Sequence, residues 1–420
     1  MGRVLPLRGL ACGALLLGLS SAALGQSPPT LEDVEQLKGQ LAALQKQVDE
    51  LAAKIEALQG ATPEAPPGPP PSETTAAPAG AGGAGGPEGA LPLYGSAAAS
   101  SKVFNPDISA IGDFVGAVGR SPGGGEPSLE LHEAELGFQA IVDPYARADF
   151  FFAFGPEEIG VEEGYITFLT LPGGLLAKAG KMRDAFGKMN AMHNHVVPFA
   201  DRPLVTQNLT GGEDGLADFG ISLAELIPNP WLFLEATGQV YRGQNEVFSG
   251  RTRGDLSYVG HLRAYHDLTE ASNLDLGSSI AYGSNDSGPG FHTRLLGIDA
   301  TYRWKPLRRA IYTRFLGRTE LVWSRRDEPA AVQDAFGFYT LAEYQFARRW
   351  VAGGRFDYSN RATDASLTDK GGSLLLTFRP SEFSQIRGQY RHTRFGEGRT
   401  ANEFLFQFLF SIGAHGAHPF

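Results

Sequence analysis

The sequence predicts an all-β fold, a transmembrane antiparallel β-barrel of about 16 strands, preceded by an α-helical coiled coil. Segments with a two-residue period recur from about residue 107, and short and long connections alternate between them. The closing segment, 402–420, places a row of apolar side chains on one face of a strand: Phe404, Phe406, Phe408, Phe410 and Ile412. Such a face needs lipid or a dry core. A buried strand of a soluble sandwich is the alternative for this segment.

Composition agrees with a barrel and excludes some functions. The chain has 420 residues with 54 Gly, 27 Phe and 13 Tyr, and charged residues make up 20%. Abundant glycine suits a fold with many turns, and abundant phenylalanine and tyrosine suit strands with girdles of aromatic side chains. A net charge of −10 without a basic run argues against nucleic acid as a partner. The one cysteine, Cys12, lies in a segment expected to be removed, which excludes thiol chemistry and cysteine-ligated metals in the mature chain.

Residues 1–25 are predicted to be a secretory signal peptide. They combine basic residues, an apolar run beginning at Leu10, and small residues at Ala23 and Gly25 before the expected cut. No later stretch approaches the roughly twenty apolar residues of a transmembrane helix. An exported chain of this kind can enter a membrane only as a closed barrel, so we expect it in the cell outer membrane.

Residues 26–60 are predicted to form a periplasmic coiled coil. Apolar residues occupy positions a and d of a heptad repeat: Val34, Leu37, Leu41, Leu44, Val48, Leu51, Ile55 and Leu58. β-Branched residues at a with leucine at d favour two strands, but a trimeric barrel would impose three, and we expect three. An amphipathic helix folded back on its own domain is the alternative. Residues 61–102, rich in Pro, Ala and Gly, are predicted to be a linker.

Residues 103–420 are expected to form the barrel, with outer-membrane lipid around it and water inside. Charged residues alternate with apolar ones and cost little if they face a wet lumen. The predicted lumen-facing residues are Arg147, Asp149, Lys178, Glu235, Arg263, Arg303, Arg318, Arg355, Arg387 and Arg391. Segments near Val161 and Leu374 alternate poorly, so the strand number could differ by two.

The predicted connections sort into two rims. Short turns are expected at places such as 143–144, 305–309 and 380–383, and long loops at places such as 243–256, 325–336 and 359–370. This is the outer-membrane arrangement, with both termini periplasmic.

The longest predicted loop, 183–215, is the third on the long-loop rim. Phe186, Pro198, Phe199 and Pro203 make it more apolar and more proline-braced than a solvated loop needs, which predicts a packed segment that narrows the channel. The candidate constriction residues are Arg183, Asp184, Lys188, His193, His195, Asp201 and Arg202.

This part of the chain resembles trimeric outer-membrane porins, whose third loop makes the constriction. Gly180-Lys181-Met182-Arg183, Phe186-Gly187, Asn190 and Asp201-Arg202-Pro203 look like the corresponding region of the phosphate-selective porin O and P family, over residues of about 103 to 420. The resemblance implies a homotrimer. Phosphate selectivity is not carried over, because the basic lumen residues are matched by acidic ones such as Glu133 and Glu320, and mixed charge predicts weak selectivity.

The C-terminal residue, Phe420, resembles the signal by which such barrels are recognised by the barrel assembly machinery. Gly413, Gly416 and Pro419 interrupt the approach to it, so the match is imperfect.

No metal site and no cofactor are predicted. His193 and His195 with Asp201, or His415 with His418, could supply ligands. Metal sites also need convergent geometry and supporting groups, which two histidines in a loop or tail do not guarantee.

The expected function is passive diffusion of small hydrophilic solutes or ions through a water-filled channel. The alternative is an outer-membrane anchor or envelope tether, whose coiled coil binds the cell wall or a periplasmic partner. A barrel hydrolase would need a Ser and His pair near a rim. The sequence has no GxSxG motif, so we predict no enzyme and no catalytic residue.

Overall fold

The structure is a computed structural model, and it describes Lys46 and residues 106–122, 127–156 and 159–413. The predicted signal peptide, linker and terminal Phe420 lie outside the described residues, as does the predicted coiled coil apart from Lys46. Among the residues that the structure describes, no helix has the length and apolar character needed to cross a bilayer.

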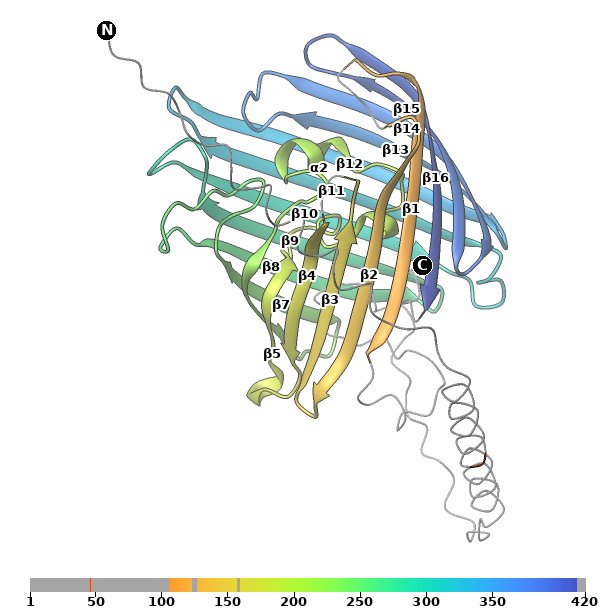
Figure 1. Ribbon diagram of the computed structural model, residues 1–420, viewed down its shortest axis with the longest axis horizontal. Coiled ribbons are helices and arrows are strands. Elements are labelled where there is room, and N and C mark those ends of the chain that lie inside the picture. The colour runs from red at the N-terminus through yellow and green to blue at the C-terminus, as the bar shows by residue number, and fades with distance from the viewer. Residues whose placement is uncertain (1–45, 47–105, 123–126, 157–158, 414–420) are drawn as a thin grey trace, which may run out of the picture. The chain divides into compact units, whose positions relative to one another are not determined.

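The described residues form sixteen strands that close into one antiparallel barrel (Figure 1). In chain order the strands are β1 (Asp107–Arg120), β2 (Glu130–Asp143), β3 (Ala146–Phe154), β4 (Ile159–Phe168), β5 (Leu176–Arg183), β6 (Ala217–Leu226), β7 (Phe233–Tyr241), β8 (Ser257–Thr269), β9 (Ser272–Ser284), β10 (His292–Trp304), β11 (Arg314–Asp327), β12 (Val332–Ala347), β13 (Trp350–Asn360), β14 (Thr368–Ser381), β15 (Ser384–Arg394) and β16 (Thr400–Gly413). Each strand pairs with its neighbours in sequence. The predicted barrel and its strand number are confirmed.

The seam between β1 and β16 closes the barrel in continuous register from Ser109 opposite Gly413 to Arg120 opposite Asn402. On β16, Phe404 is 47% exposed and Ile412 is 64% exposed, whereas Leu405 is buried. The row of phenylalanines is therefore the outer face of a closing strand, and the soluble-sandwich alternative is wrong.

The connections follow the predicted alternation only in part. β11 and β12 both extend further than predicted, so their connection spans only 328–331 rather than 325–336. The β10–β11 connection, predicted as a turn at 305–309, spans 305–313. Short turns and long loops thus do not separate strictly between the rims.

The longest connection, 184–216, joins β5 to β6 and contains η3 (Asn194–Val196) and α2 (Leu204–Leu209). Arg183, predicted to begin this loop, is the last residue of β5. The short β4–β5 turn contains η2 (Pro172–Gly174). We call residues 184–216 the inner loop, because α2 packs against the inward side of β12 and β13 (Figure 1).

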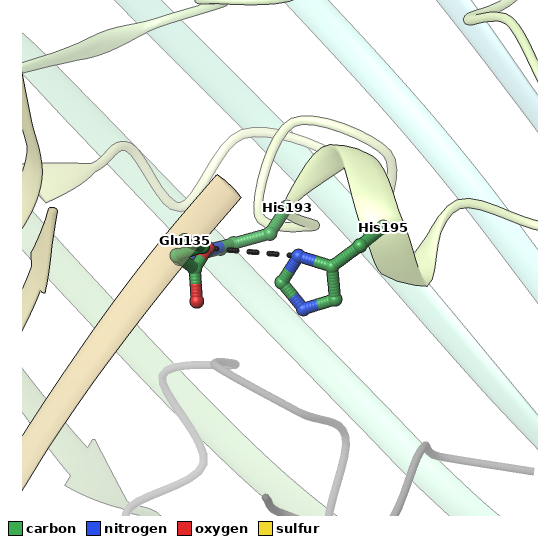
Figure 2. A group of neighbouring side chains, drawn as sticks. All are labelled: Glu135, His193 and His195. Atoms are coloured by element: carbon green, nitrogen blue, oxygen red, sulfur yellow. Dashed lines mark hydrogen bonds and ion pairs between the residues drawn. The ribbon is translucent and has the colours of Figure 1, made fainter. Parts of the chain in front are cut away.

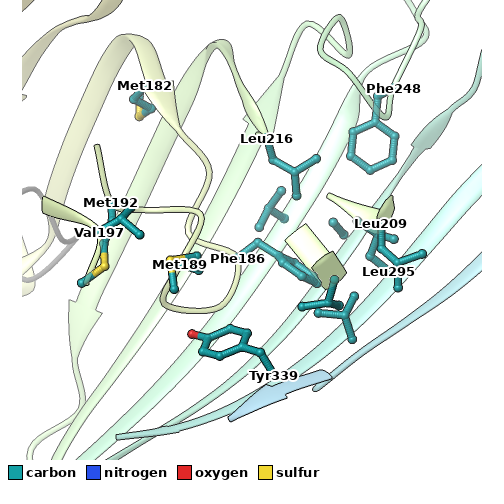
Figure 3. Close-up of a cluster of buried hydrophobic side chains, with 14 of the residues drawn as sticks. Met182, Phe186, Met189, Met192, Val197, Leu209, Leu216, Phe248, Leu295 and Tyr339 are labelled. Atoms are coloured by element: carbon teal, nitrogen blue, oxygen red, sulfur yellow. The ribbon is translucent and has the colours of Figure 1, made fainter. Parts of the chain in front are cut away.

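The main apolar core lies between the inner loop and the barrel wall. Phe186, Met189 and Leu209 of the loop belong to one buried cluster with Leu295 of β10 and Tyr339 of β12 (Figure 3). Burial of these side chains against the wall stabilises a folded-in loop over a solvated one. The sequence predicted a packed segment from apolar residues such as Phe186, and Phe186 lies in this cluster.

Candidate functional site

The predicted lumen residues lie on the inner face of the strands. Arg147, Asp149, Glu235, Arg263, Arg318, Arg355 and Arg387 are buried, and Lys178, Arg303 and Arg391 are partly buried. Exposed apolar residues alternate with them: on β6, Ile221 is 58% exposed while Ser222 is buried. The inner face is therefore polar and is largely covered.

Many inner-face charges are paired along the wall. Arg263 Nη2 lies 2.9 Å from Asp275 Oδ2, and Arg147 Nη2 lies 2.6 Å from Asp149 Oδ1. Lys188 of the inner loop reaches the same Asp275 at 3.4 Å. Opposite charges at these distances compensate each other's desolvation.

Asp201 fixes the inner loop to β13 and β15. Its Oδ2 accepts hydrogen bonds from Arg355 Nη2 and Arg391 Nη1, each at 2.9 Å, and its Oδ1 accepts one from Gln389 Nε2 at 2.6 Å. Arg355 also pairs with Asp357 on its own strand. Asp201, predicted as a constriction residue, is therefore a docking residue with no carboxylate oxygen left for solvent.

Acid should weaken this contact. Burial alone would raise the pKa of Asp201, but the Arg355 and Arg391 guanidiniums outweigh it and lower the pKa to about 2. Because the folded-state pKa lies below the ordinary 3.8, the contact stabilises the fold fully above pH 3.8 and is lost as the pH falls through about 2. The shift corresponds to about 2 kcal/mol. We expect the thermal stability gap between wild type and Asp201→Asn to shrink between pH 5 and pH 2; an unchanged gap contradicts the assignment.

A second docking point lies at Gly187. The backbone N–H of Gly187 donates to Ser279 Oγ at 2.9 Å, and that of Met189 donates to Glu320 Oε2 at 3.1 Å. The N–H of Ala185 donates to Gln239 Oε1 at 2.7 Å. Gly187 has φ +61°, a conformation that favours glycine, so the turn at this residue directs the backbone N–H groups of Gly187 and Met189 at the barrel wall.

Asn190 and Arg202 brace the inner loop from within. The Asn190 amide donates to the carbonyls of Asp184 and Leu216 and accepts from the Leu216 N–H, which joins the two ends of the loop. Arg202 donates to the carbonyls of Met189 and Met192 and is buried. Arg202 therefore shapes the loop and does not line a passage.

Asp184 is also unsuited to be a fixed charge at a constriction. It is fully buried, and its desolvation together with nearby Asp218 raises the pKa of Asp184 well above its usual value. Burial therefore favours the neutral form of this carboxyl group over the charged one.

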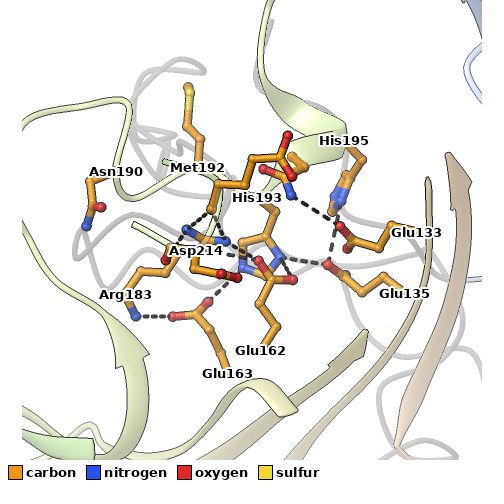
Figure 4. A network of polar contacts seen from close by, with 12 residues as sticks. Glu133, Glu135, Glu162, Glu163, Arg183, Asn190, Met192, His193, His195 and Asp214 are labelled. Carbon is orange, nitrogen blue, oxygen red and sulfur yellow. Dashed lines mark hydrogen bonds and ion pairs between the residues drawn. The ribbon is translucent and has the colours of Figure 1, made fainter. Parts of the chain in front are cut away.

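His193 and His195 lie in a cluster of carboxylates between the inner loop, β2 and β4 (Figure 4). His193 Nδ1 is 2.7 Å from Glu135 Oε2, and its Nε2 is 2.8 Å from Glu163 Oε2. Glu162 Oε2 lies 3.3 Å from His193 Nδ1. Asp201, which the sequence suggested as a third ligand, is not part of this cluster.

Polar contacts support the carboxylates from the other side. Arg183 pairs with Glu162, and its backbone N–H donates to Glu163 Oε1 at 2.7 Å. Asn194 Nδ2 donates to Glu133 Oε2 at 3.3 Å. Burial opposes protonation of His193, but the adjacent Glu162 and Glu135 carboxylates raise the pKa of His193 well above its usual value. The adjacent carboxylates thus favour the imidazolium form of His193.

A β-bulge explains why two consecutive glutamates reach the same histidine. Phe151 of β3 pairs with Glu163 and Phe152 pairs with Val161, so Glu162 is the extra residue on β4. A bulge re-aims side chains and breaks the two-residue period. Glu162 and Glu163 were absent from the predicted site, although the poor alternation near Val161 was the signal that could have revealed them.

A cavity of about 960 Å³ lies beside the inner loop on the long-loop side. Its lining includes Asn208, Glu213, Arg326, Arg361 and Arg391. A second cavity, of about 450 Å³, is lined by Glu133, Glu162, Asn194 and Glu213 and adjoins the histidine cluster. Charged side chains of both signs line both cavities.

Comparison with known proteins identifies a relative. No family model matches the chain. An uncharacterized protein of Aquifex aeolicus (strain VF5) is 31% identical over 401 residues, covering 79% of this chain and 84% of that protein. The chain belongs to the family of this Aquifex protein.

Solved structures show the fold to which this chain is similar. The chain is similar to the loop L8 deletion mutant of OmpT, an outer membrane protein of Vibrio cholerae, with a TM-score of 0.51, 10% identity, and coverage of 73% of this chain and 99% of that one. The anion-selective porin from Comamonas acidovorans gives the same four values. The trimer form of Vibrio cholerae OmpT gives a TM-score of 0.50 with 10% identity and the same coverage. The fold is that of outer-membrane porins; the narrower resemblance to phosphate-selective porins O and P is not confirmed.

Proposed function

We propose that the protein is an outer-membrane porin that allows passive diffusion of small hydrophilic solutes or ions through a water-filled channel narrowed by the inner loop. The observation that carries the proposal is a closed sixteen-strand barrel with an apolar exposed outer face and a charged inner face. Lipid accommodates the first face, and water and ions accommodate the second. Barrels of this size are wide enough for an aqueous channel.

The position of the inner loop inside the barrel favours a narrow channel over a wide one. It contacts the wall through Asp201 at β13 and β15 and through Gly187 and Met189 at β9 and β11. The polar cavity of about 960 Å³ would be the entrance on the long-loop side. Because basic and acidic side chains alternate along the wall, we propose weak charge selectivity.

The location and assembly belong to the same proposal. We propose a homotrimer, since a trimer form of Vibrio cholerae OmpT is among the similar structures. We also propose that the barrel assembly machinery inserts the chain through its C-terminal strand and that the N-terminal coiled coil lies in the periplasm. No enzymatic activity is proposed.

The second candidate is an outer-membrane anchor or envelope tether. The observation that favours it is the burial of inner-face charges such as Arg263, Arg355 and Arg387, each 5% exposed or less, behind the docked loop. A plugged barrel could serve as an anchor for a coiled coil that binds the cell wall or a periplasmic partner.

Planar-bilayer recordings on the purified full-length protein separate the two functions. A porin is expected to give stepwise currents, with reversal potentials near zero in a salt gradient because selectivity is weak. Replacing residues 188–213 by a short Gly-Ser linker should raise the unit conductance severalfold, because the loop narrows the passage. Folded protein that passes no current with or without the loop contradicts the channel. Loss of envelope cohesion after deletion of residues 31–59, with intact conductance, would add a tethering role.

A further inference from the structure

We propose that His193, His195 and Glu135 bind a divalent transition-metal ion of the Zn²⁺ type, which joins the inner loop to β2. Figure 2 shows the three side chains converging from η3, the residue before it, and β2. One ligand atom from each lies within 4.8 Å of the others, and all three residues are buried. The sequence predicted no metal site, because two histidines in a loop do not guarantee convergent ligands, and the position of Glu135 beside them is visible only in the structure.

The distances suit a tetrahedral ion. Glu135 Oε2 lies 2.7 Å from His193 Nδ1 and 3.5 Å from His195 Nδ1. Ligand atoms around tetrahedral Zn²⁺, with bonds of about 2.0–2.1 Å, are roughly 3.3 Å apart. The ion would replace the proton between His193 Nδ1 and Glu135, and Glu162 Oε2, at 3.3 Å from His193 Nδ1, could complete the coordination.

The remaining contacts of His193 are those of a metal ligand. Its Nε2 lies 2.8 Å from Glu163 Oε2, so the N–H opposite the proposed ion is donated to a carboxylate. A carboxylate in this position orients the imidazole ring of a metal-bound histidine and raises the basicity of the nitrogen that binds the metal. Glu163 is held in turn by the backbone N–H of Arg183 at 2.7 Å.

Excess negative charge gives a second, independent reason for a cation. Carboxylate oxygens of Glu133, Glu135 and Glu162 also lie within 4.8 Å of one another. Glu133 Oε1 is buried without a hydrogen-bond partner among the described residues, and Arg183 pairs with Glu162 alone of these three. Like charges this close are unfavourable unless a proton or a cation lies between them.

The ligand types select the metal. Imidazole nitrogens with a carboxylate suit Zn²⁺, Ni²⁺, Co²⁺ or Cu²⁺, whereas Ca²⁺ and Mg²⁺ prefer sites made of oxygens. The cavity of about 450 Å³ that Glu133 and Glu162 line provides a route for the ion.

The test is Zn²⁺ titration of the chelator-treated full-length protein in detergent, purified without a histidine tag and followed by calorimetry. We expect one tight site per chain. His195→Asn and Glu135→Gln should each weaken Zn²⁺ binding by at least about tenfold, and Asn194→Ala, which removes a contact to Glu133, by a smaller factor. His266→Asn, an exposed histidine on β8, is the matched control and should bind like the wild type.

A His415→Asn/His418→Asn double variant controls for the tail histidines. Visible absorption of bound Co²⁺ in the wild type, lost in His195→Asn and kept in both control variants, would establish imidazole ligation. Thermal unfolding without metal verifies that each variant is folded. The proposal is overturned if the wild type binds no Zn²⁺, if Glu135→Gln and His195→Asn bind like the wild type, or if only the tail variant loses binding.

Discussion

Replacement of Asp201 by asparagine is expected to free the inner loop from β13 and β15. Asp201 lies between Arg355 and Arg391 with 6% of its surface exposed, so the variant leaves the buried Arg355 and the partly buried Arg391 facing an uncharged amide. Removing one partner of a buried ion pair costs about 3–5 kcal/mol. The lower end applies, because Arg355 keeps Asp357 and Arg391 keeps Glu403.

Trypsin cleavage of the inner loop measures this loss directly, since Lys188 and Arg202 become accessible when the loop undocks. If cleavage follows the undocked population, about 3 kcal/mol should accelerate it roughly a hundredfold. Single-channel currents should become noisier in parallel. Asp334→Asn is the control, because the Asp334 pair with Arg325 is exposed at both side chains and contributes about 0–1 kcal/mol. Equal cleavage of Asp201→Asn and Asp334→Asn would contradict the docking role.

The barrel was predictable because its signal is local. A two-residue period needs only neighbouring residues, and on β16 it assigned Phe404 to the outer face and Leu405 to the inner face correctly. The inner loop was predictable as packed, because Phe186 and Phe199 would not remain in solvent. Its wall partners were not, since Asp201 and Arg391 are far apart in sequence and no local pattern joins them.

The site was predicted by residue type more than by role. The candidate constriction set contains the docking residue Asp201, the internal brace Arg202 and the fully buried Asp184. Charged residues in a loop suggested that their side chains line a channel, whereas only the tertiary structure shows which of these side chains face the barrel wall. Glu162 was missed for a related reason: a bulge on β4 reverses the expected side of one residue, and periodicity reports this only as poor alternation.

Replacement of Gly187 by alanine is expected to disturb the other docking point about as strongly. A Cβ at this position would overlap the Glu320 carboxylate, which accepts hydrogen bonds from Met189 N–H and from the Tyr339 hydroxyl. Alanine also pays about 1–2 kcal/mol for a left-handed conformation. A displaced, unsatisfied buried carboxylate contact adds about 1–3 kcal/mol.

Gly212→Ala is a matched control within the same loop. Gly212 has φ +69°, close to the +61° of Gly187, but nothing lies within 4 Å of an added Cβ. Both variants carry the backbone penalty, so the difference between them isolates the collision with Glu320. Trypsin cleavage and thermal unfolding should show that Gly187→Ala is less stable than Gly212→Ala by about 1–3 kcal/mol.

A double variant tests the same collision. Glu320→Ala should relieve it, so the Gly187→Ala/Glu320→Ala variant should be less destabilised than the sum of the two single changes. Additive effects, or equal losses at Gly187 and Gly212, would show that this turn does not hold the loop against β11.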